Sequence, residues 1–245
     1  MMHIGVLFVM AAPTWAEKGS GKPFSKIDNR EIFMRAIELY ANRERVQQRI
    51  LCVLPDDLSR VQEKYGAHLA FQGVGAAAGG PDWFGAAGRG LEKLKPEVDT
   101  VIIHDACCPA VPYIVLDALE EAVEKTGAAA PVVPVGGATV RLKNGTIGQW
   151  TSDSQLQLVQ SPQIFSRSVL QNAYSQRATL TGTGALADDA ALVKRAGTEV
   201  TTVPGWRLNI RIDHEELIKL GSDAIKHLPR ARSNAPVSPF DEAQW

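Results

Sequence analysis

Residues Asp99–Pro109, DTVIIHDACCP, contain the segment around which the fold is organised. Val101, Ile102 and Ile103 form a continuous apolar run, which is typical of a strand buried on both faces of a parallel sheet. The run ends at a carboxylate, Asp105. Because ligands of open α/β sheets bind outside the carboxyl ends of the strands, Asp105 is the first candidate for a metal or substrate contact. The alternative is that it only caps the turn that follows.

Segments with strand and helix periodicity alternate on both sides of this run. Buried strands are predicted over residues 4–10, 50–54, 67–72, 129–135 and 199–203, with a further strand over 208–212. Helices are predicted over residues 32–40, 55–65, 114–123, 166–174, 188–196 and 214–227. Such alternation indicates right-handed crossovers and a mainly parallel sheet, which places the chain in the α/β class.

A hairpin interrupts the alternation. Thr139–Leu142 and Thr146–Trp150 are short strand-like runs that flank Asn144 and Gly145. Asn-Gly between two such runs favours the tight turn of a β-hairpin. Two interpretations stay open: the hairpin is an ordinary surface feature, or it projects from the sheet and contacts another subunit.

The composition indicates one globular domain. The chain has 245 residues, of which 45% are hydrophobic and 22% charged, and its formal net charge is −1. A nearly neutral chain does not bind nucleic acid polymers through bulk electrostatics, so an anionic ligand must be held by local geometry. No segment of the sequence has the length and apolar character of a membrane span. We expect a single domain over residues 1–228 and a flexible tail over 229–245, where periodicity is absent.

The cysteines exclude several classes of protein. Cys52, Cys107 and Cys108 do not make a disulfide framework, so the chain suits a reducing compartment and we expect it in the cytoplasm. The adjacent pair lacks the further Cys or His residues of a zinc site and is interpreted as two small residues in a tight turn. A nicotinamide-linked oxidoreductase is also disfavoured, because no G-x-G-x-x-G follows the first strand.

Two segments offer groups that bind anions. The loop over residues 13–23 contains Lys18 and Lys22 together with glycines, and the backbone N–H groups of such a loop can cradle phosphates. The alternative is an ordinary solvated loop. In residues 208–212, Asn209 and Arg211 alternate with apolar neighbours and offer an amide and a fixed cation for phosphate recognition.

Several short motifs follow one another along the chain. They are Ala11-Ala12 after the first strand, Lys22-Pro23-Phe24, HDA-x-x-P at 104–109, V-P-V at 133–135, S-P-Q-I-F at 161–165, DDA-x-L-V at 188–193 and G-x-x-x-N-I-x-I at 205–212. In order and spacing this set resembles the methylerythritol phosphate cytidylyltransferases of isoprenoid precursor synthesis. The resemblance extends from Ile4 to about Ile225, nearly the whole chain.

The resemblance implies a fold, a reaction and partners. The fold would be a Rossmann-like, GT-A-like nucleotidyltransferase, which is a three-layer sandwich with a mainly parallel sheet and a β-arm protruding over residues 139–159. The acceptor's phosphate would attack the α-phosphorus of CTP, form a cytidine diphospho-alcohol and release pyrophosphate. Mg²⁺ would be the cofactor, CTP and a phosphorylated small-molecule acceptor would be the substrates, and the arm would mediate homodimerisation.

The resemblance also implies roles for single residues. Lys22, Asp105 and Arg211 would be catalytic, with Asp105 as the Mg²⁺ ligand and Arg211 where the family has a lysine. The implied nucleotide-binding residues are Ala11, Ala12, Lys18, Gly79, Gly80, Asp82 and Ala86. The implied acceptor-binding residues are Thr139, Arg141, Asp188 and Asn209.

Some positions depart from the family pattern. In the first loop, Pro13 and Trp15 stand where the family has glycines. Trp83 replaces an arginine of the base-binding segment, and Cys108 replaces the arginine of H-D-A-x-R-P. Asp153 lies near the place of an arginine that holds the acceptor phosphate, which reverses the charge there.

Three hypotheses stay open at this point. In the first, the chain is a working cytidylyltransferase whose missing cations are replaced by one or more of Lys18, Lys22, Arg141 and Arg207. In the second, it is a nucleotidyltransferase that uses another nucleotide or acceptor. In the third, it is a non-catalytic relative that binds a nucleotide or a protein partner.

Overall fold

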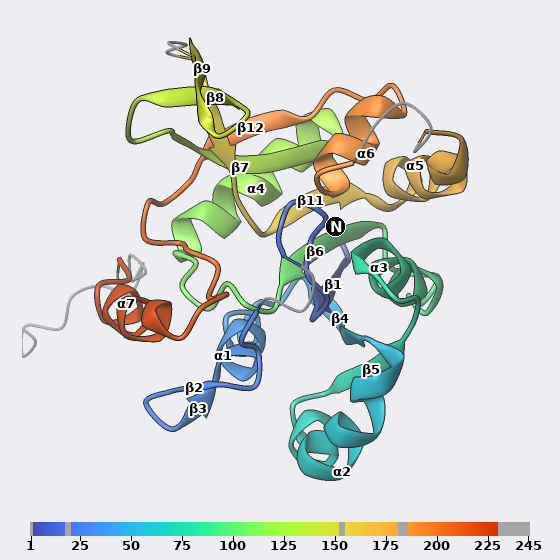
Figure 1. Cartoon of the computed structure of the whole chain (residues 1–245). Helices are drawn as coiled ribbons and strands as arrows, with labels where there is room; N and C mark the ends of the chain where they lie inside the picture. The colour runs from blue at the N-terminus through green and yellow to red at the C-terminus, as the bar shows by residue number, and fades with distance from the viewer. Residues whose placement is uncertain (1, 18–20, 152–154, 181–185, 230–245) are drawn as a thin grey trace, which may run out of the picture.

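The computed structural model describes residues 2–17, 21–151, 155–180 and 186–229. Lys18, Asp153 and all but the first residue of the predicted tail lie outside these ranges. The chain folds around a central sheet with the strand order β10-β7-β11-β6-β1-β4-β5, and β12 also pairs with β7 (Figure 1). These strands are β1 (Ile4–Val9), β4 (Val46–Val53), β5 (Val74–Ala78), β6 (Thr100–Asp105), β7 (Ala128–Pro134), β10 (Gln157–Val159), β11 (Gln163–Ser166) and β12 (Thr201–Pro204).

The sheet is parallel over β6, β1, β4 and β5, and β12 is parallel to β7. β11 runs antiparallel to both β6 and β7. Its first residue, Gln163, pairs with Ile103, so the residues that precede β11 lie beside the carboxyl end of β6. The prediction of an α/β fold with a mainly parallel sheet is confirmed, and the antiparallel β11 brings a second segment to Asp105.

Helices cover both faces of the sheet, which gives three layers (Figure 1). Alternate residues of β1 point to opposite faces, as the pleat of a strand requires. Ile4, Val6 and Phe8 pack in one buried cluster with residues of α1, α2 and α4, and Leu7 and Val9 pack in the other with residues of α3, α5 and α6. The helices are α1 (Ile32–Glu38), α2 (Pro55–Phe71), α3 (Trp83–Glu92), α4 (Tyr113–Thr126), α5 (Arg167–Leu180), α6 (Asp189–Arg195) and α7 (Glu216–Lys226).

The strand predicted over residues 67–72 is wrong. These residues continue α2, which ends at Phe71, and the strand begins later, at Val74. Val61, Tyr65 and Leu69 are buried at intervals of four residues, so the buried side of the helix extends one turn further than predicted.

The strand predicted over residues 208–212 is also wrong, because this segment pairs with no strand of the described sheet. The Ile212 N–H donates to the carbonyl oxygen of Cys107, and the Ile212 carbonyl accepts from the N–H of Lys22. The segment thus makes single backbone hydrogen bonds to two different loops. The alternation of polar and apolar residues had instead predicted the regular hydrogen bonds of a β-strand.

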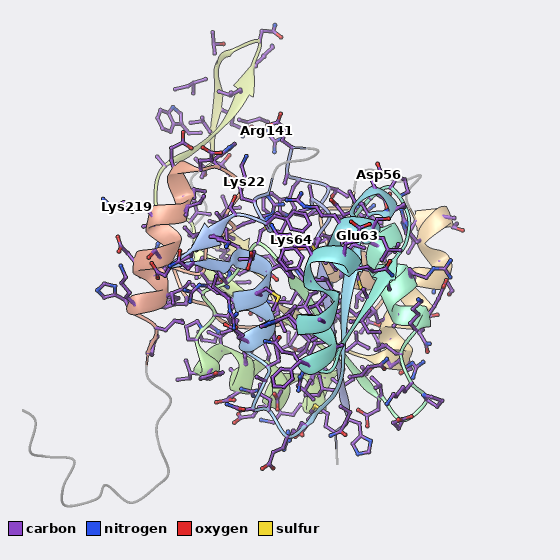
Figure 2. All side chains as sticks on the ribbon, turned by 90° about the horizontal axis from the view of Figure 1, so that it is seen from below. Lys22, Asp56, Glu63, Lys64, Arg141 and Lys219 are labelled. Atoms are coloured by element: carbon purple, nitrogen blue, oxygen red, sulfur yellow. The ribbon has the colours of Figure 1, made fainter. Side chains whose placement is uncertain are left out.

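The predicted hairpin is present as β8 (Thr139–Lys143) and β9 (Thr146–Thr151), and Figure 2 shows it projecting from the body of the molecule. Asn144 and Gly145 have φ values of 50° and 78°, the left-handed pair that a tight hairpin turn requires. A second, short hairpin consists of β2 (Lys26–Ile27) and β3 (Arg30–Glu31). Within the described ranges, none of the helices combines the length and the hydropathy needed to cross a bilayer.

Candidate active site

Asp105 ends β6 and lies at the centre of the site. Its Oδ2 accepts a hydrogen bond from Arg211 Nε at 2.7 Å, and its Oδ1 accepts one from the Cys107 N–H at 2.8 Å. The Asp105 N–H donates to Ser161 Oγ at 2.7 Å, which ties the end of β6 to the segment before β11. Burial raises the pKa of the Asp105 carboxyl, and the neighbouring Arg211 offsets part of that increase.

His104 fixes the turn that carries these contacts. Its Nε2 donates to the Cys108 carbonyl oxygen at 2.8 Å, so that its Nδ1, 2.8 Å from Tyr40 Oη, accepts from the tyrosine hydroxyl. Burial lowers the pKa of His104 to about 4, and the ring is therefore neutral near pH 7. Both ring nitrogens are used structurally, so His104 supports Asp105 and is not itself a candidate for proton transfer.

Arg211 is held from two sides. Ile212, its neighbour, is fully buried against Ile27 and Ile32 in a third apolar cluster. On the other side, a Cβ added to Gly21 would lie 2.8 Å from Arg211 Nη2, and Gly21 has a φ of +117°. Only glycine combines that backbone conformation with so close an approach. Burial lowers the pKa of Arg211, but Asp105 more than offsets this effect, so the pKa is raised and the guanidinium keeps its charge.

Two cavities lie near this ion pair, which lines the first of them. The first, which we call the Asp105 cavity, has a volume of about 530 Å³, and the second, the first-loop cavity, has about 580 Å³. The Asp105 cavity is lined by residues that include Trp15, Asp105, Cys108, Leu158, Asp188, Arg207, Asn209 and Arg211. The first-loop cavity is lined by residues that include Ala11, Ala12, Pro13, Gly21, Phe24, Asp57, Arg60 and Asp82. Gly21 lines the first-loop cavity and lies against Arg211, which lines the Asp105 cavity, so these two residues connect the two cavities.

A buried carboxylate connects the helices behind these cavities. Asp189, the first residue of α6, accepts from Trp83 Nε1 of α3 and from Tyr174 Oη of α5, both at 2.7 Å. Burial raises the pKa of Asp189 to about 6, although the two donors counteract the shift. Trp83 is thus engaged in the core, which explains why an aromatic residue can stand at this position.

The comparisons with known proteins agree with this geometry. The sequence model of the family IspD, 2-C-methyl-D-erythritol 4-phosphate cytidylyltransferase, matches residues 6–223. The chain belongs to this family. A cytidylyltransferase of that name from Geobacillus kaustophilus is 32% identical over 202 residues, which are 81% of this chain and 86% of the relative. The one from Clostridioides difficile is 25% identical over 214 residues, 87% of this chain and 90% of the relative.

Solved structures of IspD-family proteins share the fold. The 2-C-methyl-D-erythritol 4-phosphate cytidylyltransferase of Thermus thermophilus superposes with a TM-score of 0.74 at 24% identity, covering 92% of this chain and 100% of the other. The 4-diphosphocytidyl-2C-methyl-D-erythritol synthase of Anaerococcus prevotii gives 0.77 at 16% identity, with 92% and 96% covered. At this level of identity the likeness establishes a nucleotidyltransferase fold.

The nucleotide-binding residues implied by the IspD resemblance do not all face a cavity. Ala11, Ala12 and Asp82 line the first-loop cavity. Gly79 and Gly80 pack closely on α3, where Gly85 leaves no room for a Cβ on either. Ala86 is fully buried in the cluster that includes α3, so its side chain touches core residues in this conformation. Lys18 lies outside the described residues.

The acceptor-binding residues implied by the same resemblance also divide into two groups. Asp188 and Asn209 line the Asp105 cavity. Thr139 and Arg141 lie on the projecting hairpin and are absent from the lining of both cavities among the described residues (Figure 2). Within one chain, Thr139 and Arg141 of the hairpin therefore lie outside the cavity that Asp188 and Asn209 line.

Sequence reasoning missed some of the residues that shape the cavities. Gln160 and Ser161 fix the loop over residues 205–209 and the end of β6, and the S-P-Q-I-F motif was the signal that could have found them. Arg60 stacks over the ring of Phe24, 3.8 Å from its centroid, at the wall of the first-loop cavity. No local pattern distinguishes Arg60 from any other charge on the surface of α2.

The donor set around Asp105 fits Mg²⁺ only as part of a substrate complex. Asp105 accepts hydrogen bonds from the Cys107 N–H and from Arg211 Nε, and its carboxylate oxygens are ligands of the kind that Mg²⁺ prefers. The described residues contain no cluster of three His, Cys, Asp or Glu side chains that could hold a metal. Mg²⁺ binds through one or two carboxylates together with substrate phosphates, and Asp105 fits that pattern.

Proposed function

We propose that this chain transfers CMP from CTP to 2-C-methyl-D-erythritol 4-phosphate, with release of pyrophosphate. The observation that supports it is the buried Asp105–Arg211 pair in the wall of one cavity, with Gly21 of a second cavity packed against Arg211; each cavity is large enough for one substrate. Family membership supports both the reaction and its place in isoprenoid precursor synthesis. The first-loop cavity would take the nucleotide, and the Asp105 cavity would take the acceptor.

The reaction requires alignment and charge neutralisation. An oxygen of the acceptor's phosphate forms a bond to the α-phosphorus of CTP, and the bond from that phosphorus to the oxygen bridging to the β-phosphate breaks, so pyrophosphate leaves. Arg211 is buried and charged, and it would stabilise the negative charge that develops there. The Lys22 N–H donates to the Ile212 carbonyl oxygen, so the backbone of Lys22 lies beside the residue that follows Arg211, and its side chain would supply a second cation to the reaction.

We assign Mg²⁺ to this reaction, with Asp105 as its protein ligand. When bound, the ion would neutralise part of the charge of the triphosphate. Asp105 would hold it at the sheet edge, while Ser161 and Cys107 fix the position of this residue through its N–H and its Oδ1.

We further propose that two chains associate through the arm, in the cytoplasm. Leu142, Ile147 and Trp150 of the hairpin are 65%, 56% and 63% exposed, an apolar surface that a second copy would cover. Dimerisation would also bring Thr139 and Arg141 of one chain to the other chain. Sedimentation of the wild type and of Leu142→Glu with Trp150→Glu tests this: the proposal expects a dimer that the double variant dissociates, and a monomeric wild type contradicts it.

The activity is tested by following pyrophosphate release with each of the four NTPs, Mg²⁺ and 2-C-methyl-D-erythritol 4-phosphate. The proposal expects release with CTP and dependence on both Mg²⁺ and the acceptor. Release with another NTP alone would support a nucleotidyltransferase of different specificity. If no NTP turns over, calorimetric titration with CTP and Mg²⁺ distinguishes a nucleotide-binding relative from one that has lost the site.

A further inference from the structure

The Asp105 cavity contains a cation that the family's roles leave unassigned. Arg207 and Arg211 are its two arginines, and Asp105 and Asp188 are its two acids. Arg211 is paired with Asp105, and Asp188 caps α6 by accepting from the Ala191 N–H and also accepts from Gln163. Among the described residues, no carboxylate forms an ion pair with Arg207, so its charge is available to a ligand.

The loop that carries Arg207 is fixed in place. The side-chain amide of Gln160 donates to the carbonyl oxygens of Trp206 and Asn209, and its oxygen accepts from the Trp206 N–H. Gly205 donates to the Val132 carbonyl oxygen of β7. Bonds on both sides of Arg207 therefore hold its backbone at the cavity wall, so binding a ligand here requires the side chain of Arg207 to be ordered but not the loop that carries it.

Asn209 provides a second, independent indication of a ligand. Its Nδ2 donates to the Ser161 carbonyl oxygen at 2.6 Å, which fixes the orientation of the amide. Its Oδ1 is buried and has no hydrogen-bond partner within the described structure, and the residue is only 6% exposed. A buried acceptor without a donor is unfavourable, so this atom calls for a hydroxyl or N–H from a molecule in the cavity.

The remaining wall of the cavity is largely apolar. Trp15, Leu158 and Val159 contribute to it and are partly exposed to solvent. A phosphate in such a cavity finds few donors other than the guanidinium groups. Because an arginine binds phosphate oxygens through two parallel N–H groups, Arg207 both holds and orients the ligand.

We propose that Arg207 binds the phosphate of the acceptor and that Asn209 Oδ1 accepts a hydrogen bond from one of its hydroxyl groups. The acceptor class is thus a phosphomonoester of a polyol whose carbon skeleton lies against Trp15. This inference rests on the proposed function, because it places the acceptor in the Asp105 cavity. Arg207 would then determine specificity for the acceptor, from the same chain that provides Asp105.

The test compares Arg207→Ala, Arg207→Lys and a control, Lys219→Ala, an exposed cation of α7 that lines neither cavity (Figure 2). The acceptor in each assay is 2-C-methyl-D-erythritol 4-phosphate. For Arg207→Ala we expect the acceptor's KM to rise by a factor of about 10 to 100, the effect of losing a charge-assisted hydrogen bond. The KM for CTP should stay within a factor of about two, because uniform loss of acceptor binding leaves the other substrate unaffected. Arg207→Lys should give an intermediate value, and Lys219→Ala should match the wild type.

An unchanged KM for the acceptor in Arg207→Ala would overturn the inference, as would equal increases for both substrates. If the wild type releases no pyrophosphate, the proposed function fails, and the inference is then judged by calorimetric titration with the same acceptor. Binding to the wild type that is at least tenfold weaker in Arg207→Ala supports it. Equal affinity, or no binding to the wild type, overturns it.

Discussion

Asp189 makes the stability of the protein depend on pH in a direction opposite to ordinary acid denaturation. The carboxyl group is buried between Trp83 and Tyr174, and burial raises its pKa from 3.8 to about 6. The folded protein therefore binds a proton that the unfolded chain has released. As pH falls through 6, this group contributes stability, and the gain is complete below 3.8, where both states are protonated.

The magnitude follows from the two pKa values. The full shift corresponds to about 3 kcal/mol, and between pH 7 and pH 5 the contribution is about 1.3 kcal/mol. Asp188 and Tyr174 are the titratable groups that face Asp189, and Arg177 of α5 contributes a cation beside Tyr174. His104 acts in the opposite direction, since burial lowers its pKa.

A difference measurement isolates Asp189 from these other groups. The free energy of unfolding in urea is measured at pH 7 and pH 5 for the wild type, for Asp189→Asn and for Asp56→Asn, an exposed carboxyl of α2 (Figure 2). On going from pH 7 to pH 5, Asp189→Asn should lose about 1.3 kcal/mol relative to the wild type, because its amide does not titrate. Asp56→Asn should follow the wild type. Identical pH dependence of the wild type and Asp189→Asn would refute the reasoning.

Three further outcomes are expected. Asp105→Asn should abolish pyrophosphate release and lower the free energy of unfolding by about 3 kcal/mol, because the buried Arg211 loses its nearest carboxylate and keeps the longer ion pair to Asp213, 3.7 Å from its Nη1; full activity would remove Asp105 from the mechanism. Gly21→Ala should reduce kcat at least tenfold, since the added Cβ meets Arg211. Gly73 also has a positive φ but lies in open space, so Gly73→Ala should lower the free energy of unfolding and leave kcat unchanged. Equal activity of the two variants would contradict this. The three buried cysteines should react with a thiol reagent only on unfolding, because burial raises the pKa of each, and labelling of the native protein within seconds would disprove it.

Local patterns were sufficient for most of the sheet. The apolar run at Val101–Ile103 is fully enclosed as part of β6, and Asn144-Gly145 turns the hairpin as predicted. Both features depend on neighbours within a few residues. The errors arose where a local pattern is compatible with two structures. Residues 67–72 were predicted as a strand but continue a helix. In residues 208–212, polar and apolar side chains alternate as in a strand, but the backbone bonds to two different loops.

The site was less predictable because its contacts join distant parts of the chain. Asp105 could be found, since it ends a buried strand, and its proximity to Arg211 followed from the resemblance. That Arg211 forms an ion pair with it, across 106 residues, depends on how two loops fold over each other. Arg207 and Asn209 line one cavity with Trp15 because distant loops fold together there. The periodicity of a sequence does not reveal contacts between loops that lie far apart in the chain.

The buried ion pair also explains how a carboxylate can act at this depth. An isolated carboxyl group in such surroundings would take up a proton and lose its ability to bind a cation. Arg211 counteracts the effect of burial on Asp105, and Asp105 in turn keeps the guanidinium charged. In the proposed reaction, Asp105 would therefore be able to hold the cation of the triphosphate, and Arg211 would offer its charge to the phosphates. If the proposed function is right, a substitution that keeps either charge but removes its partner should impair the use of both substrates, since Arg211 lines one cavity and lies against Gly21 of the other.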